Sequence, residues 1–389
     1  MNYNTRETGT IEFEVGSLYE RLKRLSDRRK ARGKRYELAL ILTLSVLAKL
    51  SGEDSVVGIA EWVKWREETL RSALQLQHAG LPHAATYRRV LGSAVDVEEL
   101  EKEVGLFLGA CVKPDEAVAI DGKSIRGSIA TGQTRGVYLL AVYAPMSGVV
   151  LRQVEIGHKE NELSATPDLL ASVNLAGRVV TGDALFTQRS LSEQIVSARG
   201  DYLWRVKDNQ PTLRADIARL FGPERVPAGA GPLKTDFQTS VTHHKVSGRC
   251  ETHTLTTSSL LNATTNWPSL AQVFRLERTV TYPASGKTTH ETVYGLTSLP
   301  ASSASPARLL SLVRNHWTIE NRLHYCRDVV FHEDASLTRF AHLPHVLAIL
   351  NNLVLSLLRL HQFDSPTAAR RQLDASPLLA LSLILSPLP

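Results

Sequence analysis

The spacing of apolar residues divides the chain into a helical part and a part rich in strands. Up to about residue 110, apolar side chains recur at helical intervals, most clearly in Leu38–Leu50 and Val56–Trp65. Beyond Glu116 they form short continuous or alternating runs, which are typical of strands. The pattern therefore predicts an α/β fold with a helical N-terminal region.

The N-terminal region is expected to contain several short helices. Besides the two runs above, helical patterns cover 69–77, 86–91 and 95–108, and a polar stretch around Pro82 interrupts them. Leu38–Leu50 is strongly apolar, yet it is too short to span a bilayer, so we expect a core helix and no membrane association. Both a DNA-binding module and a purely structural helical domain fit this region.

The elements expected after Glu116 follow the order of an RNase H-like core. The apolar run 117–120 predicts a buried strand, and two further strands form an expected hairpin. Thr166 is a good N-cap with Pro167 as the first helical residue. The expected ranges are 137–143, 149–156, 166–173, 178–182, 188–199 and 202–206. The resulting order, β-β-β-α-β-α-β, predicts a mixed sheet.

The remainder of the chain predicts a β-rich insertion followed by helices. Residues 221–299 are rich in Thr, Ser and β-branched side chains, and 273–282 with 288–296 predict a hairpin. Helical patterns return at Arg308–Arg327, Leu343–His361 and Pro366–Leu385. We therefore expect four segments: a helical domain (1–112), the first part of the core (113–220), the insertion (221–300), and the second part of the core with C-terminal helices (301–389).

Two aspartates follow apolar strands in this scheme. The run 117–120 stops at Asp121-Gly122, a turn signal, and the strand 178–182 stops at Asp183. Both carboxylates are therefore expected at the carboxyl ends of strands. A lone Asp-Gly is usually only a turn, so Asp121 needs partners before it can be assigned chemistry.

The helix expected at Arg308–Arg327 carries a further cluster of polar side chains. Glu320, His324 and Arg327 are spaced i, i+4 and i+7, with His316 one turn earlier, so they are expected on one face. Burying such groups without partners costs several kcal/mol, which favours a metal and phosphate site. A solvated polar face is the alternative.

Charge is concentrated near the N-terminus. The segment Arg21–Arg35 holds nine Lys or Arg residues against one acid, Asp27, in a chain whose net charge is +6. A local basic block is the footprint expected of a nucleic-acid binder. A solvated basic turn would show the same composition.

Other features exclude several classes of protein. Three widely separated cysteines form no disulfide framework and no Cys-x-x-Cys pair, which fits a reducing cytoplasm, and the polar start predicts no signal peptide. Lys123-Ser124 lacks the spacing of a phosphate-binding loop, so we expect no nucleotide cofactor. His and Cys spacings do not predict a zinc site either.

Several motifs in a fixed order resemble the DDE transposases of bacterial insertion sequences, in particular the H-repeat-associated (ISAs-type) group. The resemblance spans nearly the whole chain and includes the basic entry, 78–83, 159–162 and 248–252. Its main motifs are AIDGKSIRG at 119–127, TGDA at 181–184, KDNQP at 207–211 and RNHWTIEN at 314–321, followed by Asp328 and Glu333-Asp334.

The resemblance implies an RNase H-like catalytic core with three acidic residues. Asp121, Asp183 and Glu320 match these positions and would bind two Mg²⁺ or Mn²⁺ ions, with Asp121 bridging both. Asp328, Glu333 and Asp334 are rival acids for the third position. Where related transposases place a tyrosine, an arginine and a lysine around the glutamate, this chain has Val313, His316 and Arg327.

The resemblance also implies double-stranded DNA as the partner, both the inverted terminal repeats of the element and the target, with a homodimer on the DNA in a bacterial cytoplasm. Cationic and amide side chains are the candidate DNA contacts: Arg28, Arg29, Arg88, Arg89, Lys123, Arg126, Lys207, Asn209, Gln210, His316 and Arg327. Two other functions remain open: a transposase-derived DNA-binding protein that is catalytically inactive, and a metal-dependent nuclease that does not join ends.

Overall fold

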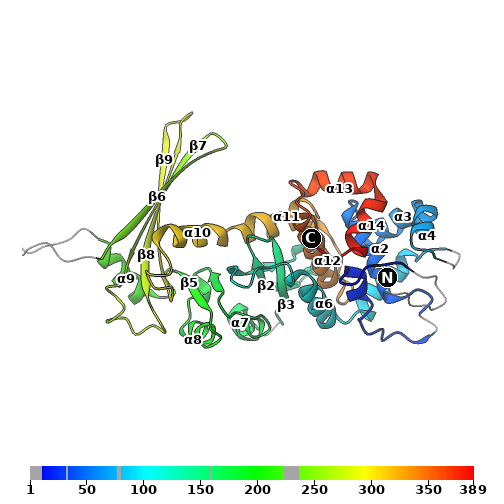
Figure 1. Ribbon diagram of the computed structural model, residues 1–389, viewed down its shortest axis with the longest axis horizontal. Coiled ribbons are helices and arrows are strands. Elements are labelled where there is room, and N and C mark those ends of the chain that lie inside the picture. The colour runs from blue at the N-terminus through cyan, green and yellow to red at the C-terminus, as the bar shows by residue number, and fades with distance from the viewer. Residues whose placement is uncertain (1–10, 32–33, 77–79, 158–159, 223–235) are drawn as a thin grey trace, which may run out of the picture. The chain divides into compact units, whose positions relative to one another are not determined.

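The computed structural model describes residues 11–31, 34–76, 80–157, 160–222 and 236–389 (Figure 1). The chain forms two compact units. The first comprises 1–113, 122–165 and 319–389, and the second comprises 114–121 and 166–318. Arg32 and Lys159, which contributed to the sequence motifs, lie outside the described residues.

The N-terminal helices of the first unit confirm the helical prediction. Four of them are capped by side chains of Ser17, Ser55, His83 and Asp96, each of which accepts a backbone N–H in the first turn. The helices are α1 (Leu18–Leu22), α2 (Leu38–Leu50), α3 (Val56–Trp65), α4 (Glu67–Ala73), α5 (Ala84–Arg89) with a π-helical turn at Val90–Ala94, and α6 (Val97–Gly109).

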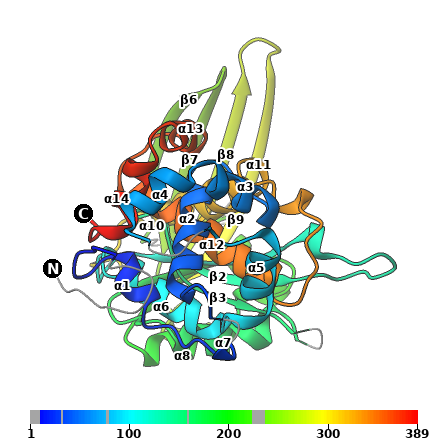
Figure 2. The ribbon, with the colours of Figure 1, turned by 90° about the vertical axis from the view of Figure 1, so that its right-hand side faces the viewer.

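Helix α2 lies at the centre of this unit because it is apolar on all sides. Every one of its residues is buried, as expected for a helix without a polar face. Its partners include α1 and α3 and three C-terminal helices, namely α12 (Leu343–Leu360), α13 (Pro366–Ala375) and α14 (Pro377–Leu385) (Figure 2). The two ends of the chain therefore build one helical layer.

Among the described residues, α12 is the one helix whose length and composition would allow it to cross a membrane, and 89% of that stretch is buried inside the protein. It packs against α2, α6 and β3. This environment is that of a core helix.

The first unit also contains a β-hairpin. Strands β2 (Tyr138–Ala144) and β3 (Val149–Glu155) pair antiparallel, with an irregularity between Val142 and Tyr143. Helices α6 and α12 pack on β3. The hairpin matches the predicted one to within a residue at each end.

The second unit is built on parallel strands extended by long antiparallel ones. The N-terminal half of β1 (Val118–Ser124) pairs in parallel with β4 (Val179–Gly182), which pairs in parallel with β5 (Asp201–Val206). Beyond β5 the order is β9 (Lys287–Thr297), β8 (Gln272–Tyr282), β7 (Arg249–Ser258) and β6 (Gln238–Val246), all antiparallel. The β-rich insertion therefore continues the sheet.

Helices cover this sheet. Helix α10 (Pro306–His316) packs across β4, β6 and β7, while α8 (Arg189–Ser197) packs on β5 and α9 (Pro211–Leu220) packs on β8 and β9. With α7 (Glu162–Ala171), the chain order β1-β2-β3-α7-β4-α8-β5 is the predicted β-β-β-α-β-α-β. The α/β class with a large mixed sheet is confirmed.

The predicted turn at Asp121-Gly122 is wrong, because β1 continues to Ser124. A Cβ on Gly122 would lie 2.5 Å from the Tyr138 hydroxyl oxygen, so this glycine permits a close approach to β2. Past the strand, the Ile125 N–H donates to the Val137 carbonyl at 2.9 Å. The chain thus stays extended beside β2 where the sequence suggested a reversal.

Helix α7 begins earlier than predicted and contains Pro167 in its interior. Asn161 and Ser164 cap each other: the Ser164 N–H donates to Asn161 Oδ1 and the Asn161 N–H to Ser164 Oγ, both at 3.0 Å. This reciprocal box starts the helix a turn before Thr166. The local cap therefore prevails over the Thr-Pro signal.

Two long predicted helices are each divided in the structure. The stretch Arg308–Arg327 consists of α10, a π-helical turn at Ile319–His324, and α11 (Tyr325–Val329). The stretch 366–385 consists of α13 and α14, because Pro377 starts a new helix after the non-helical Ser376. Helix α9 and the β6–β7 pair were not predicted as separate elements. The four-segment division stays a prediction.

Candidate active site

Asp121 lies within β1 and Asp183 directly follows the neighbouring strand β4. In the parallel β1–β4 pair, Val118 lies opposite Val180 and Ala119 lies opposite Thr181. Each aspartate comes two residues after the second pair. Both are partly exposed. Side chains two residues apart along a strand point to the same face, so Asp121 shares a face of β1 with Ala119.

The loop after Asp183 fixes the direction of its carboxylate. Asp183 caps a short 3₁₀ turn at Ala184–Phe186, where its Oδ1 accepts the N–H of Leu185 at 2.8 Å. One carboxylate oxygen is used in this way. The residue before Asp183 is a glycine because a Cβ at Gly182 would lie 2.7 Å from the Trp204 ring.

Asn209 and Gln210 hold the same loop from the segment after β5. The side-chain amide of Asn209 donates to the Ala184 carbonyl at 2.5 Å, and that of Gln210 donates to the Thr187 carbonyl at 3.0 Å. These two predicted DNA contacts therefore have a positioning role in the structure. Lys207, three residues before Gln210, is exposed.

His316 lies at the end of α10 and is buried, with 7% of its surface exposed. Its Nδ1 is 3.1 Å from the Thr181 hydroxyl, which itself donates to the Val118 carbonyl at 3.2 Å. The imidazole thus braces the β1–β4 pair two residues before the aspartates. The prediction that His316 contacts phosphate is not supported, because the ring is enclosed by protein.

Trp317, which follows His316, packs against two cations. The guanidinium carbon of Arg205 lies 5.6 Å from the centre of its ring, and that of Arg278 lies 5.7 Å from it. The indole therefore packs within the second unit, as a cation–π partner of strands β5 and β8. Sequence spacing did not reveal this arrangement, because the three residues come from distant parts of the chain.

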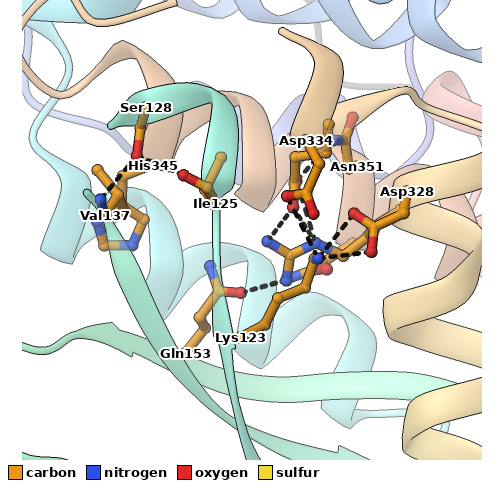
Figure 3. Close-up of polar contacts among 12 residues, drawn as sticks. Lys123, Ile125, Ser128, Val137, Gln153, Asp328, Asp334, His345 and Asn351 are labelled. Carbon is orange, nitrogen blue, oxygen red and sulfur yellow. Dashed lines mark hydrogen bonds and ion pairs between the residues drawn. The ribbon is translucent and has the colours of Figure 1, made fainter. Parts of the chain in front are cut away.

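In the first unit, Lys123 is buried and neutralises two of the rival acids (Figure 3). Its Nζ lies 2.7 Å and 2.8 Å from the two carboxylate oxygens of Asp328 and 3.6 Å from Asp334. Arg126 adds a backbone hydrogen bond to Asp334 at 3.0 Å and an ion pair at 3.6 Å. Lys123 is therefore occupied by carboxylates, whereas the Arg126 side chain remains 80% exposed.

Arg327 is the clearest correction to the predicted DNA contacts. It is completely buried and pairs with Glu333, with a shortest distance of 2.8 Å, and its Nη1 donates to Gln153 at 3.1 Å. A guanidinium in this position cannot reach a phosphate. The pair also removes Glu333 from the rival acids. The i, i+7 spacing between Glu320 and Arg327 gave no indication that Arg327 pairs with Glu333, six residues downstream.

Glu320 remains accessible on the π-helical turn. Its side chain is 63% exposed and lies 3.7 Å from His324, whose side chain is 8% exposed. Burial lowers the pKa of His324 against the opposing effect of Glu320, so the imidazole is neutral at pH 7. The helix widens at this turn, which explains why Glu320 faces solvent while Arg327 is buried.

The N-terminal candidates differ among themselves in exposure. Arg28 is 70% exposed and pairs with Asp96. Arg29 is only 7% exposed because Asp27 binds it through two hydrogen bonds at 2.9 Å and 2.8 Å, which withdraws it from the predicted DNA contacts. Arg88 and Arg89 are exposed at the end of α5.

Comparison with known proteins identifies the family of this chain. Residues 113–357 match the family model described as "Transposase DDE domain", and residues 19–108 match "DDE_Tnp_1-associated". "Putative transposase YncI" of Escherichia coli O157:H7 is 28% identical over 89% of this chain and 88% of its own. "H repeat-associated putative transposase YhhI" of E. coli K12 is 25% identical over 89% and 91%.

A solved structure, the synaptic complex of piggyBac transposase with hairpin DNA, covers 94% of this chain and 77% of its own at 12% identity. Its TM-score of 0.43 is too low to bear on fold or function. The family model, in contrast, covers well over half of the sequence. The chain belongs to the DDE transposase family.

Proposed function

We propose that this protein catalyses DNA transposition: it hydrolyses phosphodiester bonds at the ends of its element and joins the freed 3′-hydroxyls to target DNA. Asp121, Asp183 and Glu320 are the proposed catalytic carboxylates. The observation that carries the proposal is the β1–β4 register, in which each of the two aspartates comes two residues after the Ala119–Thr181 pair, within the segment matched by the DDE family model.

The donor set of these residues fits Mg²⁺ or Mn²⁺. Carboxylate oxygens are the hard ligands that both ions prefer. Asp183 Oδ1 accepts one backbone N–H, from Leu185, and this hydrogen bond orients the carboxylate. Two bound ions would supply activation of a water or 3′-hydroxyl and stabilisation of the leaving oxygen.

Elimination of the rival acids supports Glu320 as the third carboxylate. Asp328 and Asp334 pair with Lys123, and Glu333 pairs with Arg327. A carboxylate already neutralised by a buried cation is a poor metal ligand, because binding would leave that cation unpaired at a cost of several kcal/mol. Glu320 contacts a neutral imidazole and is largely exposed.

The remaining residues of the proposed site position groups or bind the duplex. Asn209 and Gln210 hold the loop that carries Asp183, and His316 braces the strands beneath it. Lys207 and Arg126, both exposed, are proposed to contact the DNA backbone. Since transposition joins two DNA ends, we propose that a homodimer acts on the DNA.

The proposal is tested with duplex DNA that carries the sequences flanking this reading frame, incubated with Mg²⁺ and a target plasmid. The wild-type protein is expected to nick the duplex and to yield joined product. Asp121→Ala, Asp183→Ala and Glu320→Ala are each expected to lose at least about 10²-fold in cleavage rate and to keep their DNA affinity. Glu68→Ala, an exposed acid on α4, is the matched control.

Three outcomes would contradict parts of the proposal. DNA binding without cleavage in either Mg²⁺ or Mn²⁺ identifies a DNA-binding protein. Cleavage without joined product identifies a nuclease. Full activity of Glu320→Ala moves the third ligand to another acid, of which Asp328 is the next candidate.

A further inference from the structure

A segment of the first unit, Asp334–His342, is held against two distant parts of the chain. Gly127 touches one end: a Cβ there would lie 2.0 Å from the Ser336 carbonyl oxygen. Gly92 touches the other end: a Cβ there would lie 2.5 Å from the Phe340 ring. Both glycines are used for close approach, so the segment is fixed by packing at both ends.

Polar contacts reinforce both attachments. The Arg126 N–H donates to Asp334 Oδ1 at 3.0 Å, and the His342 N–H donates to the Gly92 carbonyl at 3.1 Å. The guanidinium of Arg88 lies over the Phe340 ring at 4.9 Å. The 334–342 segment therefore connects the 3₁₀ turn after β1 to helix α5, and Figure 2 shows it as the orange chain beside α5.

This arrangement places four arginines and two apolar side chains on the 334–342 segment and on the two elements that it contacts. Arg88, Arg89 and Arg339 are exposed, and the Arg126 side chain is 80% exposed. Leu337 is 74% exposed and Phe340 is 36% exposed. We call the surface formed by Arg88, Arg89, Arg126, Leu337, Arg339 and Phe340 the basic ridge.

The charge of the basic ridge favours one kind of partner. The segment Asp334–His342 contains a single acid, Asp334, and this carboxylate is already shared by Lys123 and Arg126. This one carboxylate therefore does not balance Arg88, Arg89 and Arg339, whose positive charges favour an anionic partner. Phosphate groups match them in charge and in hydrogen-bonding geometry. A second copy of this chain would bring its own four arginines and would be repelled.

We propose that the basic ridge binds duplex DNA. Arg88, Arg89, Arg126 and Arg339 contact backbone phosphates, and Leu337 packs into the minor groove, where apolar side chains often lie against sugars and base steps. The ridge adds Leu337 and Arg339 to the DNA contacts Arg88, Arg89 and Arg126 that the resemblance implied. This inference rests on the proposed function for its partner, double-stranded DNA.

The test measures binding in EDTA, so that it does not depend on cleavage. A fluorescein-labelled duplex with the flanking DNA is titrated with wild-type protein, Arg339→Ala and Leu337→Ala, and anisotropy is recorded at several salt concentrations. Arg371→Ala on α13 and Leu378→Ala on α14 are the matched controls, since both side chains are exposed in the same unit.

Arg339→Ala is expected to weaken binding about 3- to 10-fold and to lower the slope of log K against log salt by about 0.9, the value for one phosphate contact. Leu337→Ala is expected to weaken binding without changing the slope. Both controls are expected to bind as the wild type does.

Wild-type affinity and slope for Arg339→Ala would overturn the proposal, and so would an equal loss for Arg371→Ala. A change of molar mass in light scattering for Leu337→Ala, with unchanged DNA affinity, would assign the ridge to a protein partner. Failure of the proposed function is distinguishable, because it appears as absent cleavage by the wild-type protein in Mg²⁺ and leaves these binding results unaffected.

Discussion

Glu333 and Asp334 are consecutive acids that pair with arginines in two different regions of the first unit. Glu333 turns inward to the buried polar cluster of Arg327, Gln153 and Asn351, with Asn351 donating to it at 3.0 Å. Asp334 turns outward to Arg126 at the edge of the basic ridge. The side chain of Arg327, in the buried cluster, is 0% exposed, whereas that of Arg126, in the basic ridge, is 80% exposed.

The difference shows how burial decides what an arginine can do. A buried guanidinium must be fully paired, because an isolated charge in a protein interior is costly, and its pairing then removes it from binding. An exposed guanidinium contributes little to stability but stays available to phosphate. The same residue type therefore has a structural role at Arg327, in the buried cluster, and a proposed binding role at Arg126, in the basic ridge.

The largest effect is expected for Arg327→Ala, which leaves Glu333 buried without its cation. Loss of one partner of a buried pair typically costs ~3–5 kcal/mol of the free energy of unfolding. Urea denaturation followed by circular dichroism measures it, with exposed Arg322→Ala as the control. A loss below ~1 kcal/mol would show that the cluster relaxes or admits water and that the contrast is weaker than the structure indicates.

Lys49, another buried cation of the first unit, provides a second test, in which removal of the charge is expected to raise the free energy of unfolding. It is 1% exposed, packs beside Phe331, and burial lowers its pKa from 10.5 to about 8. Since the unfolded chain binds the proton more tightly between pH 8 and 10.5, this group makes stability rise with pH across that window.

Lys49→Met is therefore expected to raise the free energy of unfolding at pH 7 by up to ~3 kcal/mol, the equivalent of the lowered pKa. The gain over wild type should shrink as the pH approaches 10. Urea midpoints of both proteins at pH 7 and at alkaline pH measure this difference. A constant gain at both pH values would mean that the pKa of Lys49 is the same in the folded and unfolded states.

His345 is expected to have a smaller, pH-dependent effect. Burial opposes its charge, but Glu155 at 3.2 Å and Glu101 at 3.7 Å raise its pKa above 6.5. Its contribution is then fully present below pH 6.5 and is lost as pH rises through the raised pKa. His345→Gln should cost about 1–3 kcal/mol at pH 6 and less at pH 8.5. Equal costs at both pH values would exclude a charged imidazole.

The smallest effect on stability is expected for Arg126→Ala. Its ion pair with Asp334 is exposed and 3.6 Å long, so the free energy of unfolding should change by less than ~0.5 kcal/mol. DNA affinity measured by anisotropy should nevertheless fall. A large loss of stability would place Arg126 with the buried cluster, which would remove the comparison between the two regions.

Hydrophobic periodicity was enough to predict most of the elements, including the strands that carry Asp121 and Asp183. It could not predict where a pattern is interrupted. The π-helical turn at Ile319–His324 leaves the apolar spacing almost unchanged, yet it separates the environments of Glu320 and Arg327. Burial of Arg327 and Lys123 depends on acids far away in the chain or on another element, and no local pattern records those partners.

The packing of α2 between helices from both ends of the chain affects how the protein can be divided for study. Trp62 donates to Asp374 at 2.8 Å, and Arg66 pairs with the same carboxylate at 2.7 Å. A recombinant fragment that stops near residue 112 would expose the apolar surface that α12, α13 and α14 cover. Residues 319–389 should therefore be supplied with it, as a linked or co-expressed piece, if the N-terminal helices are to be obtained in folded form.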